Sequence, residues 1–158
     1  MTEIDIPLQS ELAQYPLSSD EIRLLAEIGF MAATAGQVVP ATRIFEGLCM
    51  LRPHQPFPYI GLALSRMFVG AWQDAIRILR DEGLRVNPDN PELQLYLCLA
   101  LLVAQEPGQG ARLLSVLLVN GRLDAEEKLL ALSIQEQIDG KSARENRPRP
   151  AVLTASES

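Results

Sequence analysis

Histidine, cysteine and aromatic residues are scarce in this chain of 158 residues. The single histidine, His54, rules out a His-rich metal site, and a Ser/His/acid triad would have to recruit this one residue from a proline-rich joint. Both cysteines fall within apolar helical patterns, which favours plain buried thiols over a disulfide or a metal pair. Because aromatic residues make up only 5% of the chain, alanine and aliphatic side chains must do most of the packing, as in stacked helices.

Long apolar runs and an excess of basic charge are also missing. The longest apolar candidate, residues 93–104, contains Gln94 and stops at Gln105, which is too short for a membrane span. The first residues lack the basic and apolar regions of a signal peptide, so the sequence predicts a cytoplasmic protein. The net charge of −6 argues against nucleic acid or an anionic membrane as partner. The acidic charge is concentrated in residues 1–21, whereas residues 141–158 are basic.

No motif for catalysis stands out either. The glycines of residues 108–110 lack the lysine and the preceding strand that phosphate-binding loops need. Asp124, Glu126 and Glu127 are most simply negative charges at the start of a helix, where the helix dipole favours them. The sequence therefore predicts a protein that is not an enzyme and that uses no cofactor or metal.

What the chain does contain is a repeat. Counted from residue 22, small residues stand at positions 8, 15 and 20 (Gly29, Gly36 and Ala41), with Phe45 at 24 and Pro53 at 32. These are the signature positions of a tetratricopeptide repeat, a helix–turn–helix unit of about 34 residues. The small residues let the two helices approach closely, Gly36 can end the first helix, and Pro53 stops the second.

Two further copies follow the first. The second copy places matching residues at the same positions, and its helix over residues 71–86 holds one extra residue near Gly83 because Pro88 comes one residue late. In the third copy, the helix over 92–105 is apolar nearly all round and must be covered on more than one side. Residues 106–110 are expected to end this helix, and a short helix is expected over 111–119. A final helix over 123–138 resembles the cap at the end of a solenoid.

We predict an all-α fold, an α-solenoid of three tetratricopeptide-like helix pairs plus a C-terminal capping helix. The predicted divisions are an acidic, partly disordered arm at 1–17, a repeat domain at 18–139 with repeats at about 22–55, 56–90 and 91–121 and the capping helix at 123–138, and a disordered tail at 140–158. At the start of the domain, Ser18 and Glu21 have capping-box spacing and Leu17 and Ile22 have the spacing of a hydrophobic staple, which predicts a helix over 19–35.

The first helices of the repeats are expected to line the concave side of the solenoid. Their inward positions carry mainly apolar side chains where a peptide clamp of this fold would often present Asn, Lys and Arg. We predict an apolar, client-binding groove. Its residues are Glu27, Phe30, Thr34, Ile60, Leu64, Met67, Phe68, Tyr96, Leu99 and Val103. The alternative is that these side chains pack against the final helix or the N-terminal arm.

The chain resembles the tetratricopeptide chaperones of bacterial type III secretion, especially the class that holds translocator proteins. The resemblance covers about residues 18–105 and includes the extra residue of the second repeat. The segments that carry it are Ser18–Glu21, Phe45–Pro53, Tyr59–Ser65 and Gly70–Ile76.

This resemblance implies a virulence-associated chaperone of the bacterial cytoplasm. Such a protein holds an extended segment of a secreted client and keeps the client soluble before export. It also implies a possible homodimer through the N-terminal region. The first helix has Ala26, Ala33 and Thr34 where tyrosines are more typical, so the client could be a translocator or a needle, tip or filament subunit.

The sequence alone leaves two questions open, one about the function of the chain and one about its N-terminal arm. The chain could be a non-enzymatic tetratricopeptide scaffold or assembly regulator within a larger complex. Residues 1–16 could form a frayed arm or an arm that docks on a partner subunit, since they mix acidic residues with scattered apolar ones.

Overall fold

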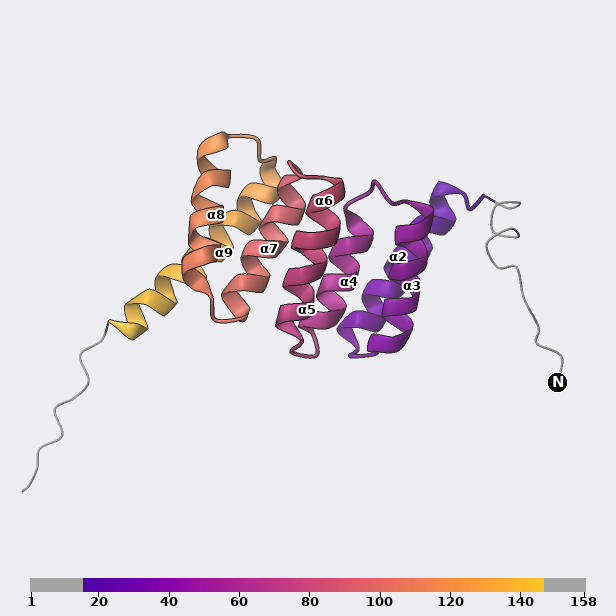
Figure 1. Cartoon of the computed structure of the whole chain (residues 1–158), viewed down its shortest axis with the longest axis horizontal. Coiled ribbons are helices and arrows are strands. Elements are labelled where there is room, and N and C mark those ends of the chain that lie inside the picture. Colours follow the sequence, from indigo (N-terminus) through magenta and orange to yellow (C-terminus); the bar gives the residue numbers. More distant parts are fainter. Residues whose placement is uncertain (1–15, 147–158) are drawn as a thin grey trace, which may run out of the picture.

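The computed structural model describes residues 16–146, which form helices and no strands, as predicted (Figure 1). The helices pair in the order of the repeats. Their bounds are α2 Ser19–Thr34, α3 Val38–Leu51, α4 Phe57–Met67, α5 Trp72–Arg77, the π-helical segment η1 Ile78–Gly83, α6 Leu84–Val86, α7 Pro91–Val103, α8 Pro107–Asn120 and α9 Ala125–Glu145.

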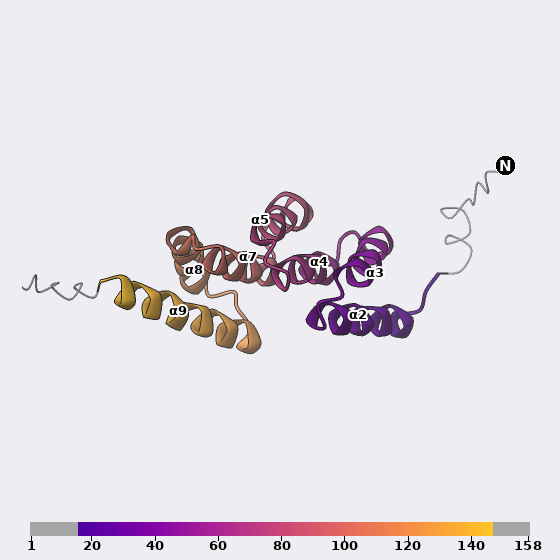
Figure 2. The same ribbon diagram turned by 90° about the horizontal axis from the view of Figure 1, so that it is seen from below.

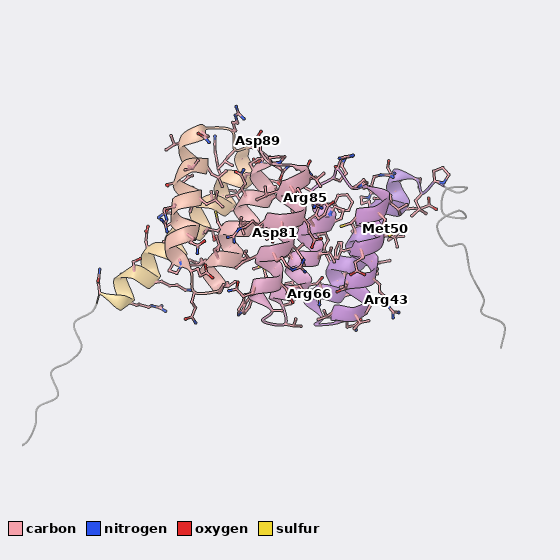
Figure 3. The ribbon with its side chains drawn as sticks, viewed as in Figure 1. Arg43, Met50, Arg66, Asp81, Arg85 and Asp89 are labelled. Atoms are coloured by element: carbon pink, nitrogen blue, oxygen red, sulfur yellow. The ribbon has the colours of Figure 1, made fainter. Side chains whose placement is uncertain are left out.

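The first helices of successive repeats define one face of the molecule. In Figure 2, α2 and α9 lie on one side of α4 and α7, whereas α5 covers α4 and α7 from the other side. We call the side bordered by α2 and α9 the A-helix face. The opposite side is charged: the labelled side chains Arg43, Asp81 and Arg85 in Figure 3 project from α3, η1 and α6.

The first helix begins as its sequence predicts. The backbone N–H of Ser18 donates to Glu21 Oε2 at 2.7 Å, and the backbone N–H of Glu21 donates to Ser18 Oγ at 3.3 Å, which completes the capping box. Leu17 packs against the core cluster that contains Ile22, as a hydrophobic staple requires. These contacts fix the point where the chain enters the repeat domain.

The ring of Phe45 explains the small residues of the first repeat. Phe45 and Ala41 are completely buried, and a Cβ at Gly29 would lie 2.9 Å from the Phe45 ring. A Cβ at Gly61, in the next repeat, would overlap the same ring. Gly36 adopts a φ of +73°, the left-handed conformation that ends α2.

The extra residue of the second repeat is absorbed by a π-helical turn. Residues 72–86 run as one helix in which η1 replaces the α-helical hydrogen-bonding pattern between α5 and α6. A π-turn holds one residue more than an α-turn, so the flanking segments keep their packing. Gly83 lies at its end, where a Cβ would approach Leu93 Cδ2 to 3.0 Å and Tyr59 Cβ to 3.2 Å.

Helix α7 is covered on two sides, as its all-round apolar sequence predicts. One set of its side chains joins the large core beneath α4 and α5, including Leu93 and Leu97. The other set, including Leu95 and Leu102, joins a second core with α8 and α9. The helix thus connects the first two repeats to the C-terminal part of the molecule.

Two predicted boundaries need correction. The expected break at 106–110 is wrong, because α8 begins at Pro107 rather than Ala111; proline fits the first turn of a helix, and the chain turns earlier, at Gln105 with a φ of +63°. The expected end at 139 falls inside α9, which continues to Glu145. Lys141 Nζ donates to the Leu102 carbonyl at 2.9 Å and ties this extension to α7. The arm at 1–15 and the tail at 147–158 lie outside the described residues.

Candidate functional site

An apolar hollow of about 420 Å³ opens on the A-helix face between α2 and the start of α4. Phe30 forms one wall, and its ring is held edge-on against Phe45 with the ring centroids 4.8 Å apart at 62°. The hollow is lined by Ser19, Ile22, Arg23, Ala26, Glu27, Phe30 and Phe57. Such a concave, apolar surface favours an aliphatic or aromatic side chain as its occupant.

Charged groups stand only at the rim of this apolar hollow. The Arg23 guanidinium lies 3.3 Å from Asp20 Oδ1 and 3.9 Å from Glu27 Oε1, and all three side chains are largely exposed. Exposed ion pairs of this kind add little stability, about 0–1 kcal/mol. Arg23 can therefore exchange its partners for an incoming carboxylate at small cost.

A second, acidic hollow of about 360 Å³ lies between the N-terminal turns of α7 and α9. Asp124 and Glu127 form a capping box at the start of α9, with both of its hydrogen bonds at 2.8 Å. Burial raises the pKa of Glu92, and the negative charges of Glu127 and Asp124 raise it further by smaller amounts. Burial, followed by Glu92, also raises the pKa of Tyr96. This end of the face therefore disfavours further negative charge.

The ten predicted groove residues divide into three groups. Glu27 and Phe30 line the apolar hollow, and Tyr96 lines the acidic one. Thr34 and Phe68 are exposed at the ends of α2 and α4. The remaining five are half-buried or buried against the main core: Leu64, Leu99 and Val103 are half-buried, and Ile60 and Met67 are buried with 2% and 8% exposure.

The predicted set of groove residues leaves out two features of the face. Phe57, at an inward position of the second repeat, lines the apolar hollow beside Phe30. Helix α9 borders the face and does not merely cap it, since Glu126 and Leu130 line the acidic hollow. Glu126 and Leu130 are four residues apart, a spacing that places both on one face of a helix. This spacing is the feature of the sequence that could have indicated their shared position.

Within residues 16–146, the structure gives little support for a metal site, a membrane span or reactive thiols. This part of the chain holds no cluster of three or more potential metal ligands. None of its helices is long and apolar enough to cross a membrane. Burial raises the pKa of the thiols of both Cys49 and Cys98 to about 12, and neither forms a disulfide.

Comparison with known proteins gives a result at the level of structure only. No protein-family model matches the sequence, and no curated protein matches it. Among solved structures, the chain is similar to the Yersinia enterocolitica type III secretion translocator chaperone SycD in an alternative dimer, with a TM-score of 0.65 and 21% identity over 82% of this chain and 98% of SycD.

Two further solved structures have the same fold. One is SycD in complex with a peptide of the translocator YopD, with a TM-score of 0.63 and 20% identity over 82% of this chain and 98% of that one. The other is a type III secretion complex from Aeromonas hydrophila, with a TM-score of 0.62 and 21% identity over 89% and 99%. The chain therefore has the fold of the translocator chaperones.

Proposed function

We propose that this chain is a bacterial, cytoplasmic type III secretion chaperone without enzymatic activity. It binds an extended, apolar segment of a secreted client on the A-helix face and keeps that client soluble until export. The observation that carries the proposal is the apolar hollow walled by Phe30 and Phe57, on a fold shared with a chaperone whose structure includes a translocator peptide.

The physical mechanism requires no covalent chemistry. An apolar side chain that enters the hollow leaves water and contributes about 25 cal/mol per Å² of buried apolar surface. Client binding also lowers the concentration of free client, so self-association of the client falls by mass action. We propose a translocator as the client class, with a needle, tip or filament subunit as the alternative.

Co-expression with the secreted proteins of the same locus tests this proposal. We expect one otherwise insoluble client to become soluble and to elute with this chain as a discrete complex in size-exclusion chromatography with light scattering. If the chain rescues none of these clients and stays alone, the chaperone function is wrong.

Substitutions on the A-helix face locate the binding surface. We expect Phe68→Glu to weaken client binding at least tenfold in a pull-down titration, because it places a charge among the apolar side chains of the predicted groove. Phe68 is 51% exposed, so its substitution should cost little stability. Met67 is unsuitable for this test because it is buried in the core.

Met50→Glu is the matched control. Met50 is 66% exposed on α3 and is labelled in Figure 3, on the opposite side of the molecule. It should bind the client as the unchanged protein does. Equal loss of binding in this control would place the client on another surface.

A structural scaffold is the second candidate function. Val116 and Val119 of α8 are 55% and 84% exposed, so a partner could bind this end of the solenoid. A scaffold would join a larger complex through α8 without solubilising any client. Substitution of Val119 by Glu would then abolish assembly, whereas Phe68→Glu would not.

A further inference from the structure

The apolar hollow lies where the N-terminal arm joins the repeat domain. The hollow is lined by residues at the start of α2, namely Ser19, Ile22 and Arg23. Only residues 16–18 separate the arm, residues 1–15, from the start of this helix. Arg52 Nη2 donates to the Leu17 carbonyl at 3.4 Å, and Leu17 packs on the core, so the point of attachment is fixed at the edge of the hollow. A segment attached at this point has only a short distance to span to reach the hollow.

The arm carries side chains that suit the hollow. Ile4, Ile6 and Leu8 alternate with Asp5 and Pro7, so an extended chain would present the three apolar side chains on one side. From residue 8 to residue 18 the chain can span about 30 Å, which is enough to cross the first turns of α2 and reach the hollow.

Charge distinguishes the two hollows. Residues 1–15 contain Glu3, Asp5 and Glu11 and no basic residue. At the rim of the apolar hollow, the exposed Arg23 stands beside Asp20 and Glu27, which offset its charge, so this hollow lacks the strong negative charge of the other. The acidic hollow between α7 and α9 would instead repel the arm, because its lining already holds four carboxyl groups.

We propose that the N-terminal arm, residues 1–15, docks through Ile4, Ile6 and Leu8 in the apolar hollow of its own chain. The arm covers Phe30 and Phe57 while no client is bound. Because an uncovered apolar hollow promotes self-association, this placement keeps the free protein from aggregating.

Tethering makes a weak contact sufficient. A tether of about ten residues holds the arm at a local concentration on the order of 1 mM. An arm with a dissociation constant of about 0.1 mM would then fill the hollow roughly nine-tenths of the time and weaken client binding about tenfold. The docking does not depend on the client, whereas this competition rests on the proposed chaperone function.

Photo-crosslinking of the full chain tests the docking without a client. With p-benzoylphenylalanine in place of Leu8, we expect irradiation to join position 8 to residues 19–30 or to Phe57 in a product that keeps the mass of one chain. The same label in place of Gln9, which points to the other side of an extended arm, should give several-fold less of this product. A product with the mass of two chains would mean that the arm docks on a second copy, and no crosslink to the hollow would mean that it docks elsewhere. Either result would overturn the proposal.

A pair of variants provides the matched control. Ala26→Glu places a charge in the hollow and should abolish the crosslink, whereas Met50→Glu, 66% exposed on α3 at the opposite side of the molecule, should leave it unchanged. Thermal unfolding of both variants checks that each is folded. A crosslink that survives Ala26→Glu in a folded protein contradicts the proposal.

A second readout uses the apolar dye ANS as the probe. Leu8→Glu should release the arm and raise ANS fluorescence several-fold, and Gln9→Glu should not. Equal ANS fluorescence in Leu8→Glu and the unchanged protein would contradict the docking. Failure of client rescue leaves these results intact, and failure of the crosslink leaves client rescue intact, so the two proposals can fail separately.

Discussion

At the scale of single residues, the Phe45 ring is the centre of the first two repeats. It is completely buried and meets Gly29 of α2 and Gly61 of α4, which lie in consecutive repeats. The ring also supports Phe30, the wall of the apolar hollow. A substitution that enlarges or fills the space around the Phe45 ring should therefore change both the stability of the protein and the shape of the hollow.

Two glycine substitutions should shift stability in opposite directions. Gly61→Ala adds a Cβ that overlaps the Phe45 ring, so the free energy of unfolding should fall by about 1–3 kcal/mol. Gly47→Ala, within α3, adds a Cβ with no neighbour within 4 Å and should raise stability by about 0.5–1 kcal/mol. Urea unfolding of both variants measures the difference; equal effects would contradict this packing.

The two thiols should be unreactive in the folded protein. Burial, followed by the charges of Glu82 and Glu46, raises the pKa of Cys49 to about 12, and burial raises the pKa of Cys98 to about 12. At pH 8 both remain protonated and partly or wholly shielded. We expect a chromogenic disulfide reagent to label neither thiol in the native protein and both in urea. Rapid native labelling would contradict the burial.

At the scale of helices, the ends of the elements follow local chemistry. Capping boxes begin α2 and α9, Asn90 Oδ1 accepts from the Leu93 N–H at the start of α7, and prolines occupy the first turns of α7 and α8. The π-turn of η1 is different in kind, because it resolves a mismatch between chain length and the packing of two neighbouring repeats.

The capping box of α2 predicts a stability change and a pH dependence. Ser18→Ala should cost about 1 kcal/mol, whereas Ser19→Ala, one residue later and without a capping bond, should change stability little. The Ser18 N–H, and secondarily its hydroxyl, lower the pKa of Glu21 below its ordinary value of 4.5. Its carboxylate therefore stabilises the fold above that pH, and this contribution is lost as pH falls through the lowered pKa. The stability difference between the unchanged protein and Glu21→Gln should accordingly shrink as the pH is lowered below 4.5 in urea unfolding, and a constant difference would contradict the capping box.

At the scale of the whole molecule, the first helix of the solenoid exposes apolar side chains within the described residues 16–146. Leu24, Ile28 and Met31 form a stripe on the side of α2 away from the core, and they are 56%, 45% and 70% exposed. Terminal repeats of solenoids normally carry polar outer faces. We propose that two copies of the chain pair through this stripe.

Light scattering tests the pairing. We expect Ile28→Glu to give a monomer with a free energy of unfolding within about 0.5 kcal/mol of the unchanged protein measured as a monomer, because Ile28 contributes little to the core. Met50→Glu, on the other side of the molecule, should leave the pair intact. An unchanged protein that is monomeric at every concentration would contradict the proposal.

Sequence by itself determined the repeat units, because their signals are local. The positions of Gly29, Gly36 and Ala41 and the capping box at Ser18 depend on neighbours within one helix pair, and the extra residue near Gly83 is evident from the position of Pro88. The two-sided covering of α7 also followed from its own apolar residues.

Only the tertiary structure decided which inward residues are open to a client. Phe68 and Val103 occupy the same position in consecutive repeats, yet Phe68 is 51% exposed while Val103 is half-buried against the core. Exposure depends on how far adjacent helices are apart, and that distance is set by side chains distant in sequence, such as the Phe45 ring against Gly61. For the same reason, the contribution of α9 to the A-helix face emerged only when α7 and α9 were packed together.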